Sequence, residues 1–182
     1  MLIREASPTD AAALARVHVD SWRTTYAGIV PADYLANLSY VRREQFWCDI
    51  LSTPTPSGCV YVAAQDTGEI VGFASGGPER SGDTVYQGEL YAIYLLAPYQ
   101  RQGLGRRLTI AVIQRLLQCG LPSMLVWVLA ANPGRAFYAT LGGQQVYEKT
   151  ATIRAAQLVE VAYGWQDLRE FVQRLQFSDT LG

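Results

Sequence analysis

The segment from Glu89 to Gln118 constrains the fold more than any other part of this sequence. Residues Glu89 to Leu96 are rich in Tyr, Ile and Leu and predict a strand. A turn with two glycines, Gly103 and Gly105, follows. From Gly103 to Gln118 apolar residues recur every three or four positions, which predicts a helix. A strand that turns sharply into an amphipathic helix is typical of a domain in which helices pack on a sheet.

Helical patterns precede this segment, and strand patterns flank it. One predicted helix begins near Ser7 and ends before Gly28, and a second begins near Pro31 and continues to about Ile50. Two apolar runs joined by a glycine turn predict a hairpin. The expected strands are residues 2–6, 60–64, 70–74, 89–96, 124–129, 145–148 and 158–163, with a short helix after Asn132 and a polar helix at 167–176. This order predicts one mixed α/β sheet.

The composition argues against several classes of protein. The 182 residues carry 15 basic and 16 acidic side chains, so a nucleic-acid-binding or membrane-surface protein is not expected. Three scattered cysteines and a single histidine, His18, argue against a disulfide framework, a metal site or a Ser-His-Asp hydrolase. No apolar run is long enough for a membrane span, and the first residues lack the apolar region of a signal peptide. We therefore expect a cytoplasmic protein.

The glycine turn has the features of a phosphate-binding loop. Glycines at a helix start allow a ligand to approach the backbone, and the N–H groups of the first turn have no partner within the helix. Arg101, Arg106 and Arg107 add positive charge. The P-loop motif is absent, and Leu108 stands where a dinucleotide-binding loop has its third glycine. The two glycines alone would fit a tight strand-to-helix turn equally well, whereas Gln100 and the arginines favour a ligand.

Residues Gln100 to Gly105, Q-R-Q-G-L-G, resemble the loop of the GCN5-related N-acetyltransferase (GNAT) family, whose pattern is Q/R-x-x-G-x-G/A. Ala97 departs from the family, which often has proline there. The resemblance covers residues 2–166 and implies a single α+β domain over 1–182. Its mixed, mostly antiparallel central sheet would be flanked by helices, with a C-terminal helix and tail at 167–182. A second family pattern is matched loosely by Asn132, Ala136, Phe137, Tyr138 and Gly142.

The resemblance implies acetyl-CoA as cosubstrate and no metal. The loop amides would bind its pyrophosphate, and the strand backbone would pair with the pantetheine arm. The N–H of Leu95 would also polarise the thioester carbonyl. Asn132 would contact pantetheine or, as the stronger alternative, cap the helix that follows, and the two roles are compatible. The expected cofactor-binding residues are Ile93, Tyr94, Leu95, Gln100, Arg101, Gln102, Gly103, Leu104, Gly105, Arg106 and Asn132.

The same resemblance makes Tyr138 the acid that protonates the leaving thiolate. Phe137 and Leu141, four residues apart, predict the buried side of the short helix and leave Tyr138 at the rim of a site. A packing tyrosine is the alternative. Some members of the family that this chain resembles carry a catalytic glutamate fourteen positions before the first loop glycine, which makes Glu89 the candidate base. Strand alternation is compatible with this role, since it puts Glu89 on the same face as Leu95 unless a bulge intervenes. An equal alternative is that Glu89 is simply a charged residue at the end of a strand. Water would then serve as the base.

Aromatic residues of the early helices are candidates for the acceptor side. Trp22 and Tyr26 lie four residues apart, hence on one helix face, where they would suit an amine. Trp47 is expected in the core, and His18 is more commonly a buried or capping residue. The hypothesis is an acetyl-CoA-dependent N-acetyltransferase in which a primary amine of a small molecule or peptide attacks directly. We expect a monomer or homodimer. The alternative is a non-catalytic acyl-CoA-binding sensor on the same fold.

Overall fold

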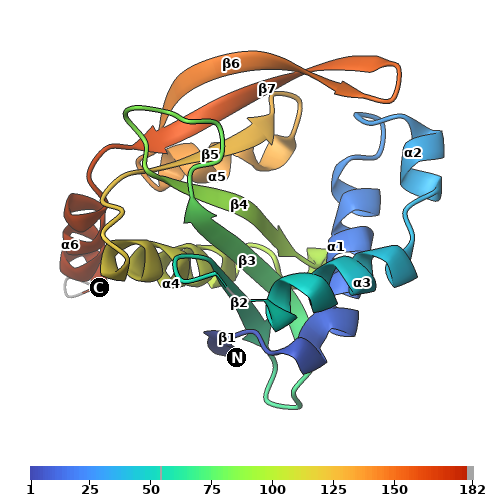
Figure 1. Ribbon diagram of the computed structural model, residues 1–182, viewed down its shortest axis with the longest axis horizontal. Coiled ribbons are helices and arrows are strands. Elements are labelled where there is room, and N and C mark those ends of the chain that lie inside the picture. Colours follow the sequence, from blue (N-terminus) through green and yellow to red (C-terminus); the bar gives the residue numbers. More distant parts are fainter. Residues whose placement is uncertain (54, 180–182) are drawn as a thin grey trace.

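A seven-stranded sheet forms the centre of the computed structural model, which describes residues 1–53 and 55–179 (Figure 1). The strand order is β1-β2-β3-β4-β5-β7-β6, and β4 and β5 form the one parallel pair among the described strands. The expected mixed, mostly antiparallel sheet is thereby confirmed. The last three residues of the predicted tail lie outside the described residues. The strands are β1 Leu2–Glu5, β2 Cys59–Ala64, β3 Ile70–Pro78, β4 Gly88–Leu95, β5 Met124–Leu129, β6 Gln144–Ile153 and β7 Ala156–Trp165.

Helices cover both faces of this sheet (Figure 1). Helices α1 and α3 pack on one face around Trp47 and Phe73, and α4 packs on the other around Leu90 and Leu108. Trp47 is 2% exposed, as expected of a core residue. Within the described part of the chain, no helix is long and apolar enough to cross a membrane. The helices are α1 Ala11–Thr25, α2 Ala32–Ala36, α3 Tyr40–Ser52, α4 Leu104–Gln118, α5 Ala136–Thr140 and α6 Leu168–Asp179.

The second predicted helix is in fact two helices, α2 and α3. The side chain of Ser39 accepts a hydrogen bond from the N–H of Arg42 at 3.3 Å, as an N-cap residue does. The prediction of one continuous helix was wrong because it followed only the spacing of apolar residues and not this cap. The break leaves the residues between α2 and α3 on the surface beside the start of α3.

A β-bulge in β4 changes which of its side chains share a face. The register of β4 against β3 shifts at Tyr91, which is left without an opposite partner. Leu90 and Leu95 consequently both pack on the α4 side, although strict alternation would put them on opposite faces. Glu89, the neighbour of Leu90, therefore points to the face opposite Leu95. The expectation that Glu89 and Leu95 share a face was wrong.

The β6–β7 hairpin is longer than predicted, with ten residues in each strand instead of short segments at 145–148 and 158–163. Most side chains of β6 are exposed or half-buried on both of its faces, so its sequence carries little alternation. Its turn contains Arg154 with φ 54°. The tip reaches over α2 (Figure 1), where the Nε of Arg154 lies 3.8 Å from the Oδ2 of Asp33.

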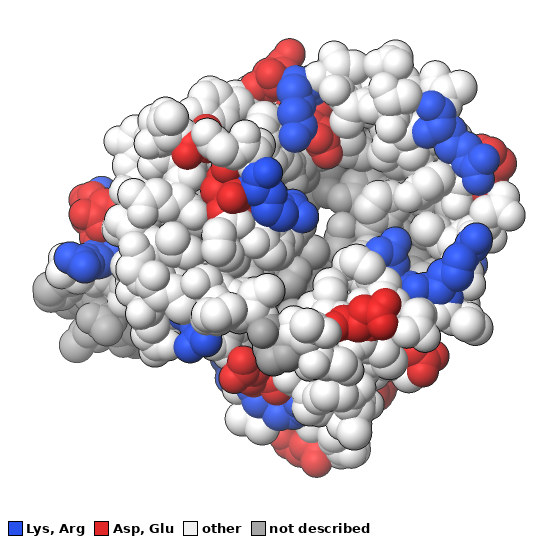
Figure 2. All heavy atoms as spheres, in the orientation of Figure 1, with Lys and Arg blue, Asp and Glu red and all other residues white. Residues whose placement is uncertain are grey.

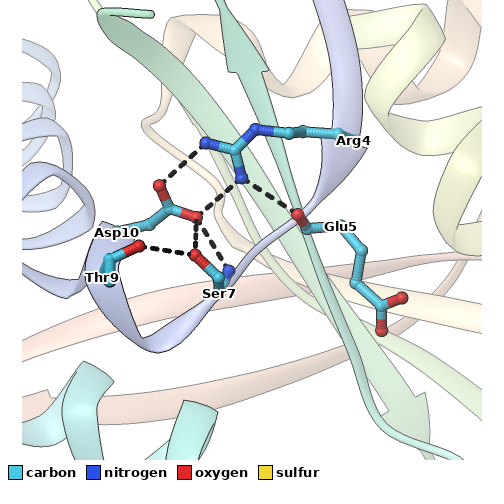
Figure 3. A network of polar contacts seen from close by, with 5 residues as sticks. All are labelled: Arg4, Glu5, Ser7, Thr9 and Asp10. Atoms are coloured by element: carbon cyan, nitrogen blue, oxygen red, sulfur yellow. Dashed lines mark hydrogen bonds and ion pairs between the residues drawn. The ribbon is translucent and has the colours of Figure 1, made fainter.

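A polar cluster fixes the start of α1 against β1 (Figure 3). The guanidinium of Arg4 donates to both carboxylate oxygens of Asp10, at 2.7 and 2.8 Å, and the N–H of Ser7 donates to Oδ2 at 2.7 Å. Hydrogen bonds from Arg4 and Ser7 lower the pKa of Asp10 to about 2, although burial opposes this shift. Asp10 is 7% exposed. Its hydrogen bonds with Arg4 and Ser7 join the first strand to α1, at whose C-terminal end Trp22 and Tyr26 lie.

Candidate active site

Strands β4 and β5 separate after a short parallel contact, and the gap between them is the first element of the site. Only Gly88 and Glu89 of β4 pair with β5 among the described residues. The N–H of Leu96 donates to Val71 of β3 at 2.9 Å, so the alternating ladder turns the polar backbone groups of Leu95 away from β3. The second half of β4 is only half-buried. It therefore presents an edge to which an extended ligand can pair.

The same alternation sets the direction of the backbone groups in the three residues that were expected to bind a pantetheine arm. Ile93 and Leu95 direct their N–H and C=O groups toward the gap, whereas Tyr94 pairs through its backbone with Phe73 of β3. The carbonyl of Leu95 accepts a hydrogen bond from the side-chain amide of Gln100 at 2.9 Å. Gln100 thus ties the end of β4 to the loop that follows.

The loop from Gln100 to Gly105 forms a concave arrangement of backbone N–H groups at the start of α4. Arg101 (φ 61°) and Gly103 (φ 79°) both adopt left-handed conformations, the geometry that turns neighbouring N–H groups toward one point and binds anions. The first helical hydrogen bond runs from Arg107 N–H to Gly103 C=O at 3.1 Å. At a helix start the N–H groups of the first residues, here Gly103, Leu104 and Gly105, have no acceptor one turn earlier in the helix. A side-chain Cβ at Gly103 would meet no atom within 4 Å, so the space before the loop is open.

Gly105 brings α5 against this loop. A Cβ at Gly105 would lie 3.3 Å from the ring of Phe137, so a larger residue would push the two helices apart. Phe137 is only half-buried, whereas Tyr138 and Leu141 are each 8% exposed. The prediction that Phe137 and Leu141 form the buried side of α5 was therefore wrong for Phe137, and it is Tyr138 that points inward.

Tyr138 lies among apolar and aromatic side chains, with its ring 5.8 Å from that of Tyr163. Burial and the neighbouring phenol of Tyr26 raise the pKa of Tyr138. The phenol therefore stays protonated at neutral pH and can act as a proton donor. Its assignment as the acid stays a prediction.

Glu89 is 4% exposed, and both of its carboxylate oxygens are engaged by Arg80. The Nε of Arg80 lies 3.0 Å from Oε2, and its Nη2 lies 2.5 Å from Oε1. The guanidinium also stacks on the ring of Tyr91, 4.1 Å from its centroid. This hydrogen-bonded pair raises the pKa of Arg80. Arg80 lies in the β3–β4 loop, and no sequence pattern connected it with Glu89.

An aromatic cluster joins α1 to β4 and α5. Trp22 and Tyr26 lie on one face of α1, with ring centroids 4.7 Å apart, and Trp22 Nε1 donates to the hydroxyl of Tyr94 at 2.8 Å. The side-chain amide of Asn132 donates to the hydroxyl of Tyr26 at 3.2 Å, while its oxygen accepts from Gly134 N–H at 2.7 Å. Asn132 is therefore an N-cap, as the stronger alternative predicted, and it also connects α1 to the segment that carries Tyr138.

His18 is buried beside this cluster. Its ring lies 5.0 Å from that of Tyr94 and 6.0 Å from that of Trp47. Desolvation, together with the charge of Arg43, lowers the pKa of His18 to about 3, so the imidazole is neutral at physiological pH. The prediction of a buried histidine is confirmed.

Comparison with known proteins identifies the family. Residues 17–142 match the model of the acetyltransferase (GNAT) family. The chain belongs to this family. The N-acetyltransferase YuaI of Bacillus subtilis, which is itself uncharacterized, is 46% identical over 166 residues, 91% of this chain and 93% of that protein.

Two solved structures with bound cofactor share the fold of this GNAT protein. PaiA N-acetyltransferase from Thermoplasma acidophilum, in complex with coenzyme A, superposes with a TM-score of 0.65 at 21% identity, covering 88% of this chain and 96% of PaiA. YncA from Salmonella typhimurium, with acetyl-CoA, superposes with a TM-score of 0.70 at 22% identity. The match covers 91% of this chain and 93% of YncA.

Proposed function

We propose that this GNAT protein is an acetyl-CoA-dependent N-acetyltransferase acting on a primary amine. The observation that carries the proposal is the open edge of β4 leading directly into the amide-lined loop at the start of α4. Family membership supports the same activity. An extended thioester with a pyrophosphate at one end matches an unpaired strand edge followed by an anion-binding loop.

The chain's own groups fit such a ligand along its length. The N–H groups between Arg101 and Arg106 would bind the pyrophosphate, and the backbone groups of Ile93 and Leu95 would pair with the pantetheine amides. Acetyl-CoA, when bound, supplies an acyl group activated as a thioester. Leu95 N–H is proposed to donate to the thioester carbonyl, where negative charge develops during attack.

Proton transfer would involve two side chains from opposite sides of the gap. The amine attacks the thioester carbon in a ternary complex, and the Tyr138 phenol gives its proton to the departing thiolate. The amine must also lose a proton. Glu89 is the proposed acceptor of that proton, directly or through water, and its carboxylate must leave the guanidinium of Arg80 to do so.

A thiol-release assay tests the proposal. Purified protein with acetyl-CoA would be screened against polyamines, amino sugars, amino acids and peptide N-termini, with free CoA as the readout. We expect at least one amine class to release CoA and form the N-acetyl product. If no amine does so while acetyl-CoA still raises the melting temperature, the protein is the non-catalytic sensor and the proposed activity is wrong.

Substitution of Tyr138 tests the acid. Tyr138→Phe should lower kcat about 10²-fold or more while leaving acetyl-CoA binding near the wild-type value, because only proton transfer is removed. Tyr147→Phe is the matched control, since Tyr147 is exposed on β6. An unchanged kcat in Tyr138→Phe would remove Tyr138 from the acid role.

A further inference from the structure

A pocket of about 350 Å³ lies between α2, the start of α3 and the tip of the β6–β7 hairpin. Three of its lining side chains are arginines: Arg42 and Arg43 from α3 and Arg154 from the hairpin. None of the described residues that line it is acidic. Figure 2 shows basic side chains on two sides of a hollow, over α3 and over α2 with the hairpin tip. Its described lining residues come from α2, α3, the segment between them and the hairpin tip, and not from β4 or the loop before α4, so the pocket is separate from the proposed pyrophosphate site.

The three cations are only partly neutralised by groups of the chain. Arg42 donates to the backbone carbonyl of Asn37 at 3.2 Å, which is an uncharged acceptor. Arg43 lies over the ring of Phe46, 5.2 Å from its centroid. Among the described residues, Arg154 is the one of the three that has an ion pair with a carboxylate, and that pair is long, at 3.8 Å, and largely exposed. Like charges gathered in one concave site repel one another unless an anion is bound, and guanidinium groups bind carboxylate and phosphate oxygens in pairs.

The backbone at the two ends of the pocket adds to this preference. Ser39 is the N-cap of α3 and Arg42 lies in its first turn, where N–H groups carry partial positive charge. On the opposite side, Arg154 occupies a left-handed turn position that glycine or asparagine adopts at lower cost. The hairpin thus places a guanidinium at the pocket rather than the residue that its turn would favour.

An aromatic row, formed by the side chains of Tyr34, Trp22, Tyr26 and Tyr94, connects the pocket to the proposed transfer site. Tyr34 lines the pocket, and its ring lies 5.9 Å from that of Trp22. Trp22 in turn contacts Tyr26 and donates to the hydroxyl of Tyr94 on β4. A molecule lying along this row would have one end at the arginines and the other near the gap beside β4.

We propose that the acceptor is an amine that also carries an anionic group, a carboxylate or a phosphate, and that this pocket binds the anionic group. The inference rests on the proposed function, because it assigns the distal end of the acceptor of the same reaction. Arg42, Arg43 and Arg154 hold the anion, and the aromatic row sets the distance between the anion and the amine. The pocket therefore selects against amines without a negative charge.

Matched acceptors test the selection. A series of ω-amino acids of increasing length is compared with the corresponding ω-amino amides and aminoalkyl phosphates in the CoA-release assay. The best carboxylate or phosphate should exceed its neutral counterpart about ten- to a hundredfold in kcat/KM, mainly through KM. The carboxylate and phosphate arms identify which anion is preferred. Equal kcat/KM for charged and neutral acceptors would overturn the proposal.

Arginine variants test the location. Arg43→Gln and Arg154→Gln should each reduce the preference for the charged acceptor about tenfold or more, with acetyl-CoA affinity unchanged. Arg154→Lys should retain part of the preference because the charge stays. Arg169→Gln, which removes an exposed charge on α6, is the control and should behave as wild type. A preference that survives in Arg43→Gln and Arg154→Gln would place the selection elsewhere.

A binding measurement separates failure of this proposal from failure of the proposed function. Glutarate and inorganic phosphate are titrated calorimetrically into wild type and into the Arg43→Gln/Arg154→Gln double variant, without acetyl-CoA. Binding to wild type that is lost in the folded double variant supports the pocket even if no amine is acetylated. Absence of binding to wild type, together with no charge preference in turnover, overturns the pocket even if neutral amines are acetylated.

Discussion

The Arg4–Asp10 pair gives a stability prediction whose size follows from one pKa. The pKa of Asp10 is lowered from 3.8 to about 2, which corresponds to about 2.5 kcal/mol of native-state stabilisation at pH 7. Because the folded pKa is depressed, this contribution is complete above about pH 5 and is lost as the pH falls toward 2. About half of it should remain at pH 3.

Asp10→Asn removes the charge and keeps the shape of the side chain. It should lower the free energy of unfolding by about 2 kcal/mol at pH 7, which for a domain of this size lowers Tm by about 4–8 °C. The difference between variant and wild type should shrink by about 1 kcal/mol between pH 7 and pH 3. Urea denaturation of both proteins at several pH values measures this directly, and groups titrating equally in both proteins cancel from the difference.

A surface pair serves as the control for this experiment. Arg16 and Glu69 lie 3.3 Å apart, but their side chains are 38% and 48% exposed, so Glu69→Gln should change stability by less than about 1 kcal/mol. A stability difference for Asp10→Asn that stays constant from pH 7 to pH 3 would refute the reasoning, because the cause would then be lost packing and not the lowered pKa.

Two further predictions concern the buried ionisable groups beside the site. His18 is the only histidine, so its imidazole proton resonances should stay at the neutral position from pH 8 to pH 5, whereas a midpoint near 6.5 in NMR spectra would contradict its burial. Arg80→Gln leaves the Glu89 carboxylate buried without its cation and should cost about 2 kcal/mol, a value kept low because Arg80 is 61% exposed. Adding Glu89→Gln should restore part of that loss in a double-mutant cycle, and strictly additive effects would show that the pair is not coupled.

Local patterns predicted much of the fold. The continuous apolar run at Met124–Leu129 is strand β5 with those bounds, and the helix expected from Gly103 to Gln118 is α4 beginning one residue later. Both segments are dictated by their own composition: a largely buried strand in one case and an amphipathic helix preceded by glycine in the other. The cap residue Ser39 can also be read in the sequence. The break between α2 and α3 was not predicted because apolar residues continue at helical spacing on both sides of Ser39.

Features that depend on pairing between distant segments could not be predicted. The bulge at Tyr91 is a property of the register between β3 and β4, and it reversed the expected face of Glu89. Arg80 reaches Glu89 from a loop whose path no local pattern specifies. The arginine pocket likewise joins α3 to the turn of a hairpin far away in the sequence.

The central claim is that the loop at the start of α4 binds the pyrophosphate of acetyl-CoA, and two glycines that flank α4 allow a matched test. Gly103 and Gly120 lie at opposite ends of the helix, both with left-handed φ, at 79° and 76°, and both with open space beside them. Leucine at either position should cost similar stability, about 1–2 kcal/mol.

Calorimetric titration of acetyl-CoA into both variants is the decisive measurement. Gly103→Leu should weaken binding about a hundredfold, because its side chain and altered backbone occupy the place of the phosphates. Gly120→Leu should bind with the affinity of wild type. Equal affinities of the two variants would contradict the proposed cofactor site.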